Sequence, residues 1–379
     1  MDLNELRQII NEIDSQIVPL FCQRMNVALE VAKYKKEHNI PVLDKNREQQ
    51  LLEKISQMAG DEFDLYETSL YNTILEISRS YQHKYINGKQ SVSKIIDEAK
   101  QRTPSEFPKS PTVACQGVSG AYSEQACRKM FDSPSITFCN TFGDVFNAVN
   151  NGKCRYGMLP IENSIAGSVN QVYDLMHENR FYIVRSIKLK VSHCLLVKKG
   201  VKRDDIKTVY SHEQAVNQCS EYIALNNFDT MICKNTAIAA KFVAESSRND
   251  IAAIASPLCA ELYGLEPLEY DIQNYKCNYT RFICISKDPE IYNGADQASF
   301  MMNIPHVQGS LYSVLSKFSS LGLNLLKLES RPLPDSNFEF MFYFDVVCNA
   351  ESGKLYTLCD ELEATLPSFT YLGSYTEVM

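Results

Sequence analysis

Residues 278–286 read NYTRFICIS and place a hydroxyl and a permanent cation, Thr280 and Arg281, at the start of an apolar run. The run at residues 282–285 has the aromatic and β-branched composition of a buried strand. Because neighbouring side chains on a strand point to opposite faces, Thr280 and Arg281 are expected to face different surroundings. Such a polar start is typical either of a solvated strand end or of one wall of a ligand site.

On both sides of this strand, short apolar stretches alternate with helical ones. The stretches TVACQ, YGMLPI, TVY and IAAIA are each followed by a predicted helix, near residues 121–131, 168–177, 213–225 and 257–263. This alternation predicts an α/β domain. From about residue 298 the order strand, helix, two strands, helix and strand predicts a smaller α+β module. Residues 87–111 are polar, carry three prolines after a short helical stretch, and predict an interdomain connector.

The N-terminal part has a helical period instead. Apolar residues follow helical spacing over residues 3–37, Asn39-Ile40-Pro41 ends that helix, and further helices are predicted near residues 45–58 and 62–85. Pro19 removes one backbone hydrogen bond, which predicts a kink and not a break in the first helix. An extended three-helix unit has no compact partner for its apolar face, so we expect a dimer.

Composition narrows the class of protein. The 379 residues suffice for two or three domains, and 38 basic against 46 acidic residues give a net charge of -8 without a long basic block, so no nucleic-acid partner is expected. No stretch approaches the roughly 18 apolar residues that span a bilayer. The 13 cysteines show no metal-binding spacing. We therefore expect a cytoplasmic protein with no membrane contact, metal or cofactor.

Polar residues interrupt the apolar helices of the first segment. Arg24 and Lys35 lie 11 residues apart and share a helix face at about 16 Å, whereas Arg7 and Lys35 are roughly 42 Å apart. If all three bind one small ligand, Arg7 must come from a second chain. The alternative is an ordinary solvated helix face.

In the middle segment, Ser, Thr, Asn or Gly follows a strand directly at four places: residues 117–123, 162–168, 211–214 and 256. Singly these are typical helix caps, but in an α/β domain such strand ends converge on one crevice where helix N-termini favour anions. The Gly117 and Gly120 pair lacks the pattern of a nucleotide loop. His193 and His212 are candidate bases without a triad partner in the sequence.

The first segment resembles the all-helical chorismate mutases over residues 1–90, through LRQIINEID, QRMNVALEVAKYK and PVLDKNREQQLLE. The resemblance implies seven chorismate-binding positions: Arg7 of a partner chain, Arg24, Lys35, Asp44, Glu48, Ser78 and Gln82. The arginines would bind the two carboxylates, and Lys35 and Gln82 would donate to the ether oxygen as catalytic groups. A pericyclic rearrangement needs only a compact conformer and such donors.

The middle segment resembles the prephenate dehydratases over residues 111–286, through QGVSGAYSEQA, GMLPIENSIAGSV, YSHEQAVNQC, ASPLCAELYGL and NYTRF. The resemblance implies a fold like the two-lobed periplasmic binding proteins, with Thr280 acting on the departing hydroxide. It also implies a prephenate pocket formed by five polar residues: Glu162, Asn163, Ser164, Ser211 and Gln218. Arg281 is a candidate counter-charge for a carboxylate, with a strand-end salt bridge as the alternative.

Residues 298–375 resemble an ACT domain, which implies a βαββαβ regulatory fold. The resemblance implies a phenylalanine site between paired domains, formed by two motifs: Gly309, Ser310 and Leu311, and Glu329, Ser330 and Arg331. Ser310 stands where the family usually has alanine.

Together the three segments predict a multidomain chain: residues 1–90 all-α, 91–110 a linker, 111–286 α/β and 298–375 α+β. The predicted function is a bifunctional enzyme of phenylalanine biosynthesis that converts chorismate to prephenate and prephenate to phenylpyruvate under feedback by phenylalanine. Three alternatives stay open: a dehydratase whose mutase-like domain only dimerises, a dehydratase that acts on arogenate, and a binding protein without turnover.

Overall fold

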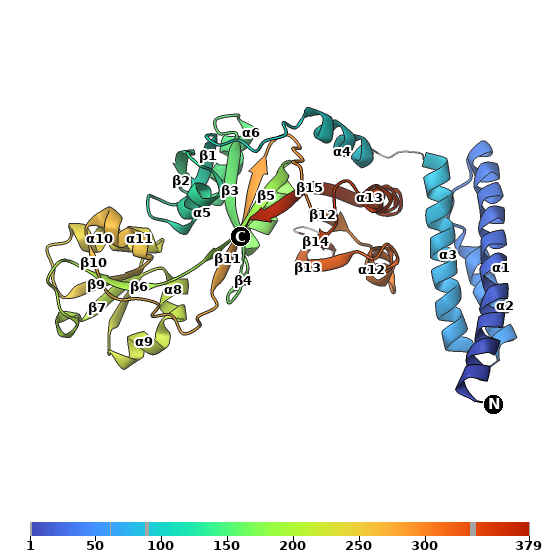
Figure 1. Ribbon diagram of the computed structural model, residues 1–379, viewed down its shortest axis with the longest axis horizontal. Helices are drawn as coiled ribbons and strands as arrows, with labels where there is room; N and C mark the ends of the chain where they lie inside the picture. The colour runs from blue at the N-terminus through green and yellow to red at the C-terminus, as the bar shows by residue number, and fades with distance from the viewer. Residues whose placement is uncertain (1, 61, 88–90, 334–338, 379) are drawn as a thin grey trace.

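The computed structural model describes residues 2–60, 62–87, 91–333 and 339–378. The helical domain lies at one end of the molecule, the two-lobed α/β part at the other, and the C-terminal module between them (Figure 1). No helix in the described ranges combines the length and the apolar character that crossing a membrane requires.

The helical domain consists of α1 (Leu3–Glu37), α2 (Lys45–Ala59) and α3 (Asp64–Asn87), close to the predicted bounds. A capping box starts α1, because Asp2 accepts hydrogen bonds from the Asn4 and Glu5 amides while the Glu5 carboxylate accepts one from the Asp2 amide. Pro19 lies within α1 and the helix continues through it, so the expectation that it does not break the helix is confirmed.

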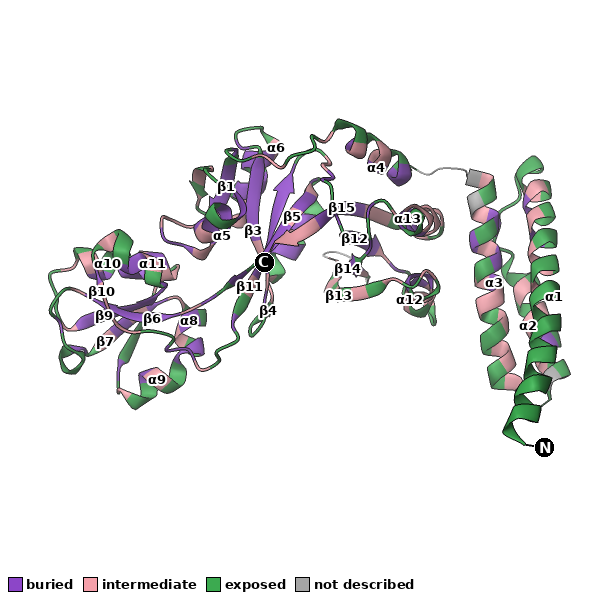
Figure 2. Ribbon diagram, in the orientation of Figure 1, coloured by how far each residue is buried: buried purple, intermediate pink, exposed green. Residues whose placement is uncertain are grey.

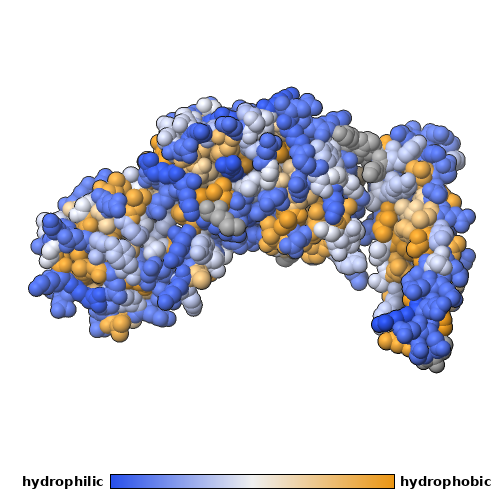
Figure 3. All heavy atoms as spheres, viewed as in Figure 1, coloured by the Kyte–Doolittle hydropathy of each residue, from blue (hydrophilic) through white to orange (hydrophobic). Residues whose placement is uncertain are grey.

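One face of α1 is apolar and exposed (Figures 2 and 3). Ala28 and Ala32 are the buried residues of this helix among those described. The exposed apolar side chains follow one another along its length: Leu3, Leu6, Ile9, Ile10, Ile13, Ile17, Val18, Leu20, Val27 and Val31. A face of this length on a free helix is typical of an interface.

The predicted linker at residues 91–110 is wrong in its first half. Residues Ser91–Arg102 form α4, whose Val92, Ile96 and Ala99 are buried in the core of the C-terminal module. Their spacing of four and three residues is that of an apolar helix face, which the polar residues between them obscure in the sequence. Ser93 Oγ donates to Asp360 Oδ1 at 2.6 Å, and Lys100 Nζ donates to the Ala350 carbonyl at 2.5 Å. The helix is therefore part of that module.

The first lobe of the α/β part is built on a sheet with helices on its faces. Its elements are β1 (Thr112–Gln116), α5 (Tyr122–Met130), β2 (Ser135–Cys139), α6 (Phe142–Asn150), β3 (Tyr156–Asn163), β4 (Gly167–Ser168), α7 (Asn170–Glu178), β5 (Tyr182–Lys190) and β11 (Tyr279–Ser286). Within it the strands run in the order β5-β11-β3-β1-β2, with β4 beside β3. The NYTRFICIS segment thus becomes a central strand, and the prediction of a buried strand is confirmed: Phe282, Ile283, Cys284 and Ile285 are all buried.

The second lobe is inserted between β5 and β11. Its elements are β6 (Cys194–Val197), a short 3-10 turn η1 (Arg203–Asp205), β7 (Thr208–Ser211), α8 (Glu213–Gln218), α9 (Ser220–Leu225), β8 (Asp229–Ile232), α10 (Thr236–Glu245), β9 (Ile251–Ala255), α11 (Pro257–Tyr263) and β10 (Glu266–Glu269). The sheet order is β10-β6-β9-β7-β8. Because the chain crosses between lobes before β6 and after β10, residues of both lobes meet at the crossing segments.

The C-terminal module has the predicted βαββαβ order. Its elements are β12 (Gln297–Asn303), α12 (Ser310–Ser320), β13 (Asn324–Pro332), β14 (Phe340–Val347), α13 (Gly353–Thr365) and β15 (Ser368–Val378). Strand β15 pairs antiparallel with β12 and then, through residues 376–378, parallel with β5. The two domains therefore share one continuous sheet.

Gly373 makes this crossing possible. It has a φ of +138°, and a Cβ atom at this position would lie 2.2 Å from the Ile183 carbonyl oxygen. Only glycine allows β15 to approach β5 this closely.

Candidate active sites

The three helices of the N-terminal domain enclose a pocket of about 550 Å³. Six of the seven predicted chorismate-binding side chains line it: Arg24, Lys35, Asp44, Glu48, Ser78 and Gln82. They come from α1, from the turn into α2, from α2 itself and from α3. Two of the predicted residues, Arg24 and Lys35, are cations and Gln82 is a neutral amide, and these are the groups that bind a dianion and donate to an ether oxygen.

Local contacts orient these side chains. Lys35 Nζ donates to the Val42 carbonyl at 2.5 Å, and Gln82 Nε2 donates weakly to Ser78 Oγ at 3.4 Å. Gln82 is buried, and its Oε1 has no partner among the described residues. Asp44 accepts from the Arg47 amide at 3.0 Å and so acts as the N-cap of α2. The Asp44 carboxylate therefore also has a structural role, because it caps the start of α2.

Two further residues bear on this pocket. Arg7 is absent from the lining of its own chain's pocket, as its distance along α1 predicted. Arg47 does line it, although it was not among the predicted chorismate-binding residues. Glu48 forms an ion pair with Arg79 of α3, which ties α2 to α3 at the pocket.

A second cavity, of about 500 Å³, lies between the lobes of the α/β part. Thr280, Asn163 and Gln218 all line it. Asn163 Nδ2 donates to Thr280 Oγ1 at 3.0 Å and to Asn278 Oδ1 at 2.8 Å, and Asn278 Nδ2 donates to Gln218 Oε1 at 3.0 Å. Three of the residues predicted for prephenate are thus joined in one hydrogen-bonded chain across the cleft.

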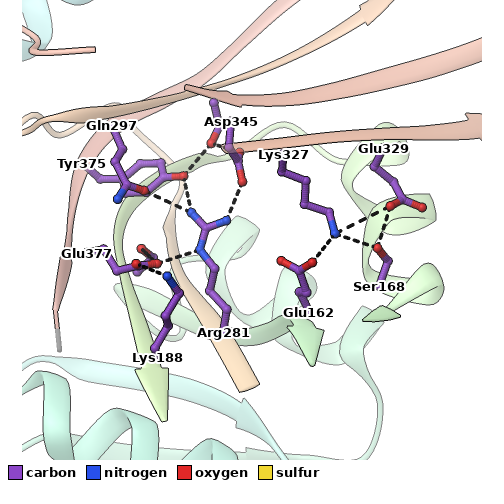
Figure 4. Close-up of polar contacts among 12 residues, drawn as sticks. Glu162, Ser168, Lys188, Arg281, Gln297, Lys327, Glu329, Asp345, Tyr375 and Glu377 are labelled. Carbon is purple, nitrogen blue, oxygen red and sulfur yellow. Dashed lines mark hydrogen bonds and ion pairs between the residues drawn. The ribbon is translucent and has the colours of Figure 1, made fainter. Parts of the chain in front are cut away.

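Arg281 lies on the opposite face of β11, against the C-terminal module (Figure 4). Its Nη1 donates to Asp345 Oδ2 at 2.5 Å, its Nε lies 2.9 Å from Glu377 Oε2, and its Nη2 donates to the Tyr375 hydroxyl at 3.0 Å. Burial alone would lower the pKa of Arg281, but Tyr375, Asp345 and Glu377 outweigh burial and raise it. The prediction that Arg281 binds prephenate is therefore wrong, and the salt-bridge alternative applies.

Three other predicted prephenate residues do not line the cleft. The Glu162 carboxylate accepts from Lys327 Nζ at 2.7 Å, on the same side of the sheet as Arg281 (Figure 4). Ser211 Oγ is buried and donates to the Ile254 carbonyl at 2.6 Å. Ser164 Oγ accepts from the Tyr279 amide at 2.9 Å and holds the turn after β3 against β11. All three side chains therefore make structural contacts and are not part of the described cleft lining.

The segment between β8 and α10 contains none of the predicted site residues, yet it contributes to the cleft. Residues 234–236 line the cleft. Among the described lining residues, Lys234 is the only lysine. Asn235 caps α10 by accepting from the Ile238 amide at 2.7 Å. The signal was a strand followed by Asn and Thr, as at the four recognised places. It was missed because β8 is an exposed edge strand without an apolar run.

His193 and His212 both line the cleft, and His212 is also the N-cap of α8. His193 Nε2 lies 3.0 Å from Gln218 Oε1, and His193 Nδ1 is buried without a partner among the described residues. Burial lowers the pKa of His193 despite the opposing effect of Gln218, so the ring is neutral near pH 7.

The two predicted phenylalanine motifs lie apart in one chain. Gly309 and Ser310 line a pocket of about 750 Å³ between α12, α2 and α3, where Ser316 Oγ donates to Glu76 Oε2 at 3.2 Å. Glu329 and Arg331 face the dehydratase lobe instead. Glu329 accepts from Ser168 Oγ at 2.6 Å, and Arg331 forms a bidentate pair with Asp174 at 3.0 and 3.1 Å. Leu311 packs on the core of the module.

Comparison with known proteins agrees with this geometry. The family model described as prephenate dehydratase matches residues 113–290, and the model for chorismate mutase type II matches residues 6–83. The fold and the two pockets define a class of protein in which an all-helical mutase domain precedes a two-lobed dehydratase domain.

The most informative relatives cover different parts of the chain. The bifunctional chorismate mutase/prephenate dehydratase of Escherichia coli K12 is 32% identical over 98% of this chain and 95% of its own length. Arogenate dehydratase 2 of Petunia hybrida is 35% identical over 69% of this chain and 71% of its own length. The prephenate dehydratase of Arthrobacter aurescens, solved in complex with L-Phe, is 28% identical with a TM-score of 0.65 and covers 70% of this chain and 90% of its own.

The chain belongs to the family of bifunctional chorismate mutase/prephenate dehydratases. It carries both activities in one polypeptide, as a chorismate mutase and as a prephenate dehydratase.

Proposed function

We propose that the pocket of the helical domain is the chorismate site, with Lys35 and Gln82 as the catalytic donors. The convergence of six side chains from three helices on one cavity supports this proposal. Gln82 is neutral at every pH and is held beside Ser78 in a buried position, so it donates to the ether oxygen as negative charge grows there.

A Gln82→Ala variant tests the role of this pocket. Loss of one such donor costs about 100-fold in kcat, so chorismate turnover falls by that factor while prephenate turnover stays at the parent level. Gln49→Ala is the matched control, because Gln49 is on α2 and donates to Glu53 on the surface. Parent-like chorismate turnover in Gln82→Ala would contradict the assignment.

We infer further that a second copy covers the apolar face of α1 and supplies Arg7 to the pocket. Both the exposed face and the distance of Arg7 from its own pocket support a dimer. Ile13→Glu places a charge in this face. The expected results are a monomer in sedimentation and a loss of chorismate turnover, with prephenate turnover retained. A dimer of unchanged stability would refute the inference.

The cleft between the lobes is the proposed prephenate site, with Thr280 donating a hydrogen bond to the departing hydroxyl. Thr280 is linked to Asn163 and Gln218 by a chain of hydrogen bonds across the cleft, and this link supports the proposed role. Loss of carbon dioxide leaves its bonding electrons in the ring and expels the hydroxyl oxygen, so a donor at that oxygen lowers the barrier. Lys234, at the N-terminus of α10, is the proposed carboxylate partner.

The lining of the cleft favours prephenate over arogenate. Among its described lining residues there is a lysine but no Asp or Glu. Arogenate carries an ammonium group where prephenate has a keto oxygen, and an ammonium in such a cleft lacks a carboxylate partner. The expected result is a higher kcat/KM for prephenate than for arogenate in paired assays.

Thr280→Ala tests the cleft directly. We expect prephenate turnover to fall by at least 100-fold with chorismate turnover unchanged. Thr230→Ala, on the exposed strand β8, is the control. Parent-like dehydration in Thr280→Ala would show that the cleft assignment is wrong.

The C-terminal module is proposed to be an ACT domain that binds phenylalanine and inhibits dehydration. Three observations support it: the βαββαβ order, the separation of the two motifs within one chain, and the sheet shared with the dehydratase lobe. Prephenate turnover measured with and without phenylalanine tests this, and Ser330→Tyr should abolish the difference by filling the site. Turnover insensitive to phenylalanine in the parent would contradict it.

A further inference from the structure

Two residues outside the predicted site complete the polar chain of the cleft. Asn278 is fully buried, and His193 is 2% exposed. Asn278 lies on the segment that crosses between lobes, where it contacts Asn163 of the first lobe and Gln218 of the second. His193 lies on the other crossing segment and contacts Gln218. The question is which way the hydrogens along this chain point.

Asn163 fixes the direction at one end. Its Oδ1 accepts from the Ile165 amide at 3.1 Å and from the Ala166 amide at 2.9 Å. Backbone N–H groups can only donate, so the other end of this side chain must be the nitrogen. That nitrogen donates to Thr280 Oγ1 at 3.0 Å. An amide nitrogen accepts no hydrogen bond, and the Thr280 hydrogen must therefore point elsewhere, with the cleft on its open side.

The same logic carries across to the second lobe. Asn278 Oδ1 accepts from Asn163 at 2.8 Å, so Asn278 Nδ2 is the donor to Gln218 Oε1 at 3.0 Å. With its oxygen held in this way, Gln218 also accepts from His193, which requires the tautomer with a hydrogen on Nε2. The Gln218 amide nitrogen has no hydrogen-bond partner among the described residues, and Gln218 lines the cleft.

We propose that Asn278 and His193 are positioning residues that fix Gln218 and Thr280 as hydrogen-bond donors toward the substrate. Two backbone amides, of Ile165 and Ala166, set the direction for the whole chain. The result is a pair of donors from different lobes aimed at a substrate that presents only oxygen acceptors at its carboxylates and keto group. This inference rests on the proposed function of the cleft.

Asn278→Asp tests the direction with almost no change in shape. The introduced carboxylate, when ionised, still accepts from Asn163, but its second oxygen faces Gln218 Oε1, and the repulsion turns the Gln218 oxygen toward the substrate. We expect kcat/KM for prephenate to fall about 100-fold at pH 8. Protonation of the introduced carboxylate restores a donor to Gln218. The activity of the variant relative to the parent should therefore rise at least tenfold as the pH is lowered, which a purely structural defect would not produce.

Asn274→Asp is the matched control. Asn274 lies on the same crossing segment and donates to Ser220 Oγ at 3.0 Å. A hydroxyl can turn and donate to the new carboxylate, so this variant should keep the activity and the pH profile of the parent. A ratio of Asn278→Asp to parent activity that does not change with pH overturns the proposal.

A pair of substitutions at His193 gives an independent test if Asn278→Asp does not fold. His193→Gln keeps a donor for Gln218 Oε1, whereas His193→Met has none. We expect His193→Gln to retain at least tenfold more kcat/KM than His193→Met. Equal losses in the two variants overturn the proposal. Thr280→Ala distinguishes a failure of the positioning proposal from a failure of the proposed cleft site. If Thr280→Ala is inactive while Asn278→Asp keeps the activity of the parent, only the positioning role is refuted.

Discussion

The ion cluster around Arg281 leads to a prediction about how the dehydratase lobe and the C-terminal module hold together. Arg281 is on β11, Asp345 is on β14 and Glu377 is on β15, so the cluster joins the two domains across their shared sheet. The side chains are 8%, 15% and 14% exposed. Arg281→Met removes the cation and leaves both carboxylates buried without it.

The size of the effect follows from the remaining partners. Removing one member of a buried ion pair typically costs about 3–5 kcal/mol. Asp345 keeps its hydrogen bond from Ser299 at 2.5 Å, and Glu377 keeps Lys188 at 2.7 Å. We therefore expect the lower end, about 3 kcal/mol. With a urea m-value of about 3 kcal/mol/M, the unfolding midpoint falls by about 1 M.

The assay is urea unfolding of the full chain, monitored as loss of prephenate turnover. Arg203→Met is the control, because its pair with Glu269 is 47% and 41% exposed and is expected to contribute less than about 1 kcal/mol. Adding Asp345→Asn to Arg281→Met removes one orphaned charge and should recover at least half of the loss. Equal midpoints in Arg281→Met and Arg203→Met would refute the reasoning.

Three further predictions concern the cleft and the domain junction. Lys234→Met removes a charge-assisted contact of about 1.5–3 kcal/mol, so the KM for prephenate should rise about 10- to 100-fold in steady-state assays; an unchanged KM argues against Lys234 as a carboxylate partner. Gly373→Ala combines a positive φ with a clash against the Ile183 carbonyl, and a loss of about 3 kcal/mol should appear as a lower urea midpoint, against no change if β15 can shift. Burial lowers the pKa of His193. Below a pH of about 6.5 the unfolded chain therefore binds a proton that the folded chain does not, and the free energy of unfolding decreases as the pH is lowered. The fall between pH 7.5 and 5.5 should be smaller in His193→Gln, and equal slopes would contradict this account.

The helical domain shows how far periodicity and spacing reach. The bounds of α1, α2 and α3 follow from apolar spacing, because a helix places every third or fourth residue on one face whatever lies around it. The same geometry brought Arg24 and Lys35 together and excluded Arg7 from its own pocket. The sequence could not tell that α4 packs on the last module, since its core partners lie some 200 residues or more further along the chain.

Within the single strand NYTRFICIS, some properties are determined by the local sequence and others only by the tertiary structure. The alternation of a strand placed Thr280 and Arg281 on opposite faces, and composition made the rest of the segment buried. Both properties are local. The surroundings of each face are not local. The cleft forms only where the two lobes meet, and the carboxylates that pair with Arg281 belong to Asp345 and Glu377, which lie 64 and 96 residues further along the chain. Backbone geometry therefore decided which way these residues point, and only the packing of distant segments decided that one faces the cleft between the lobes and the other a domain junction.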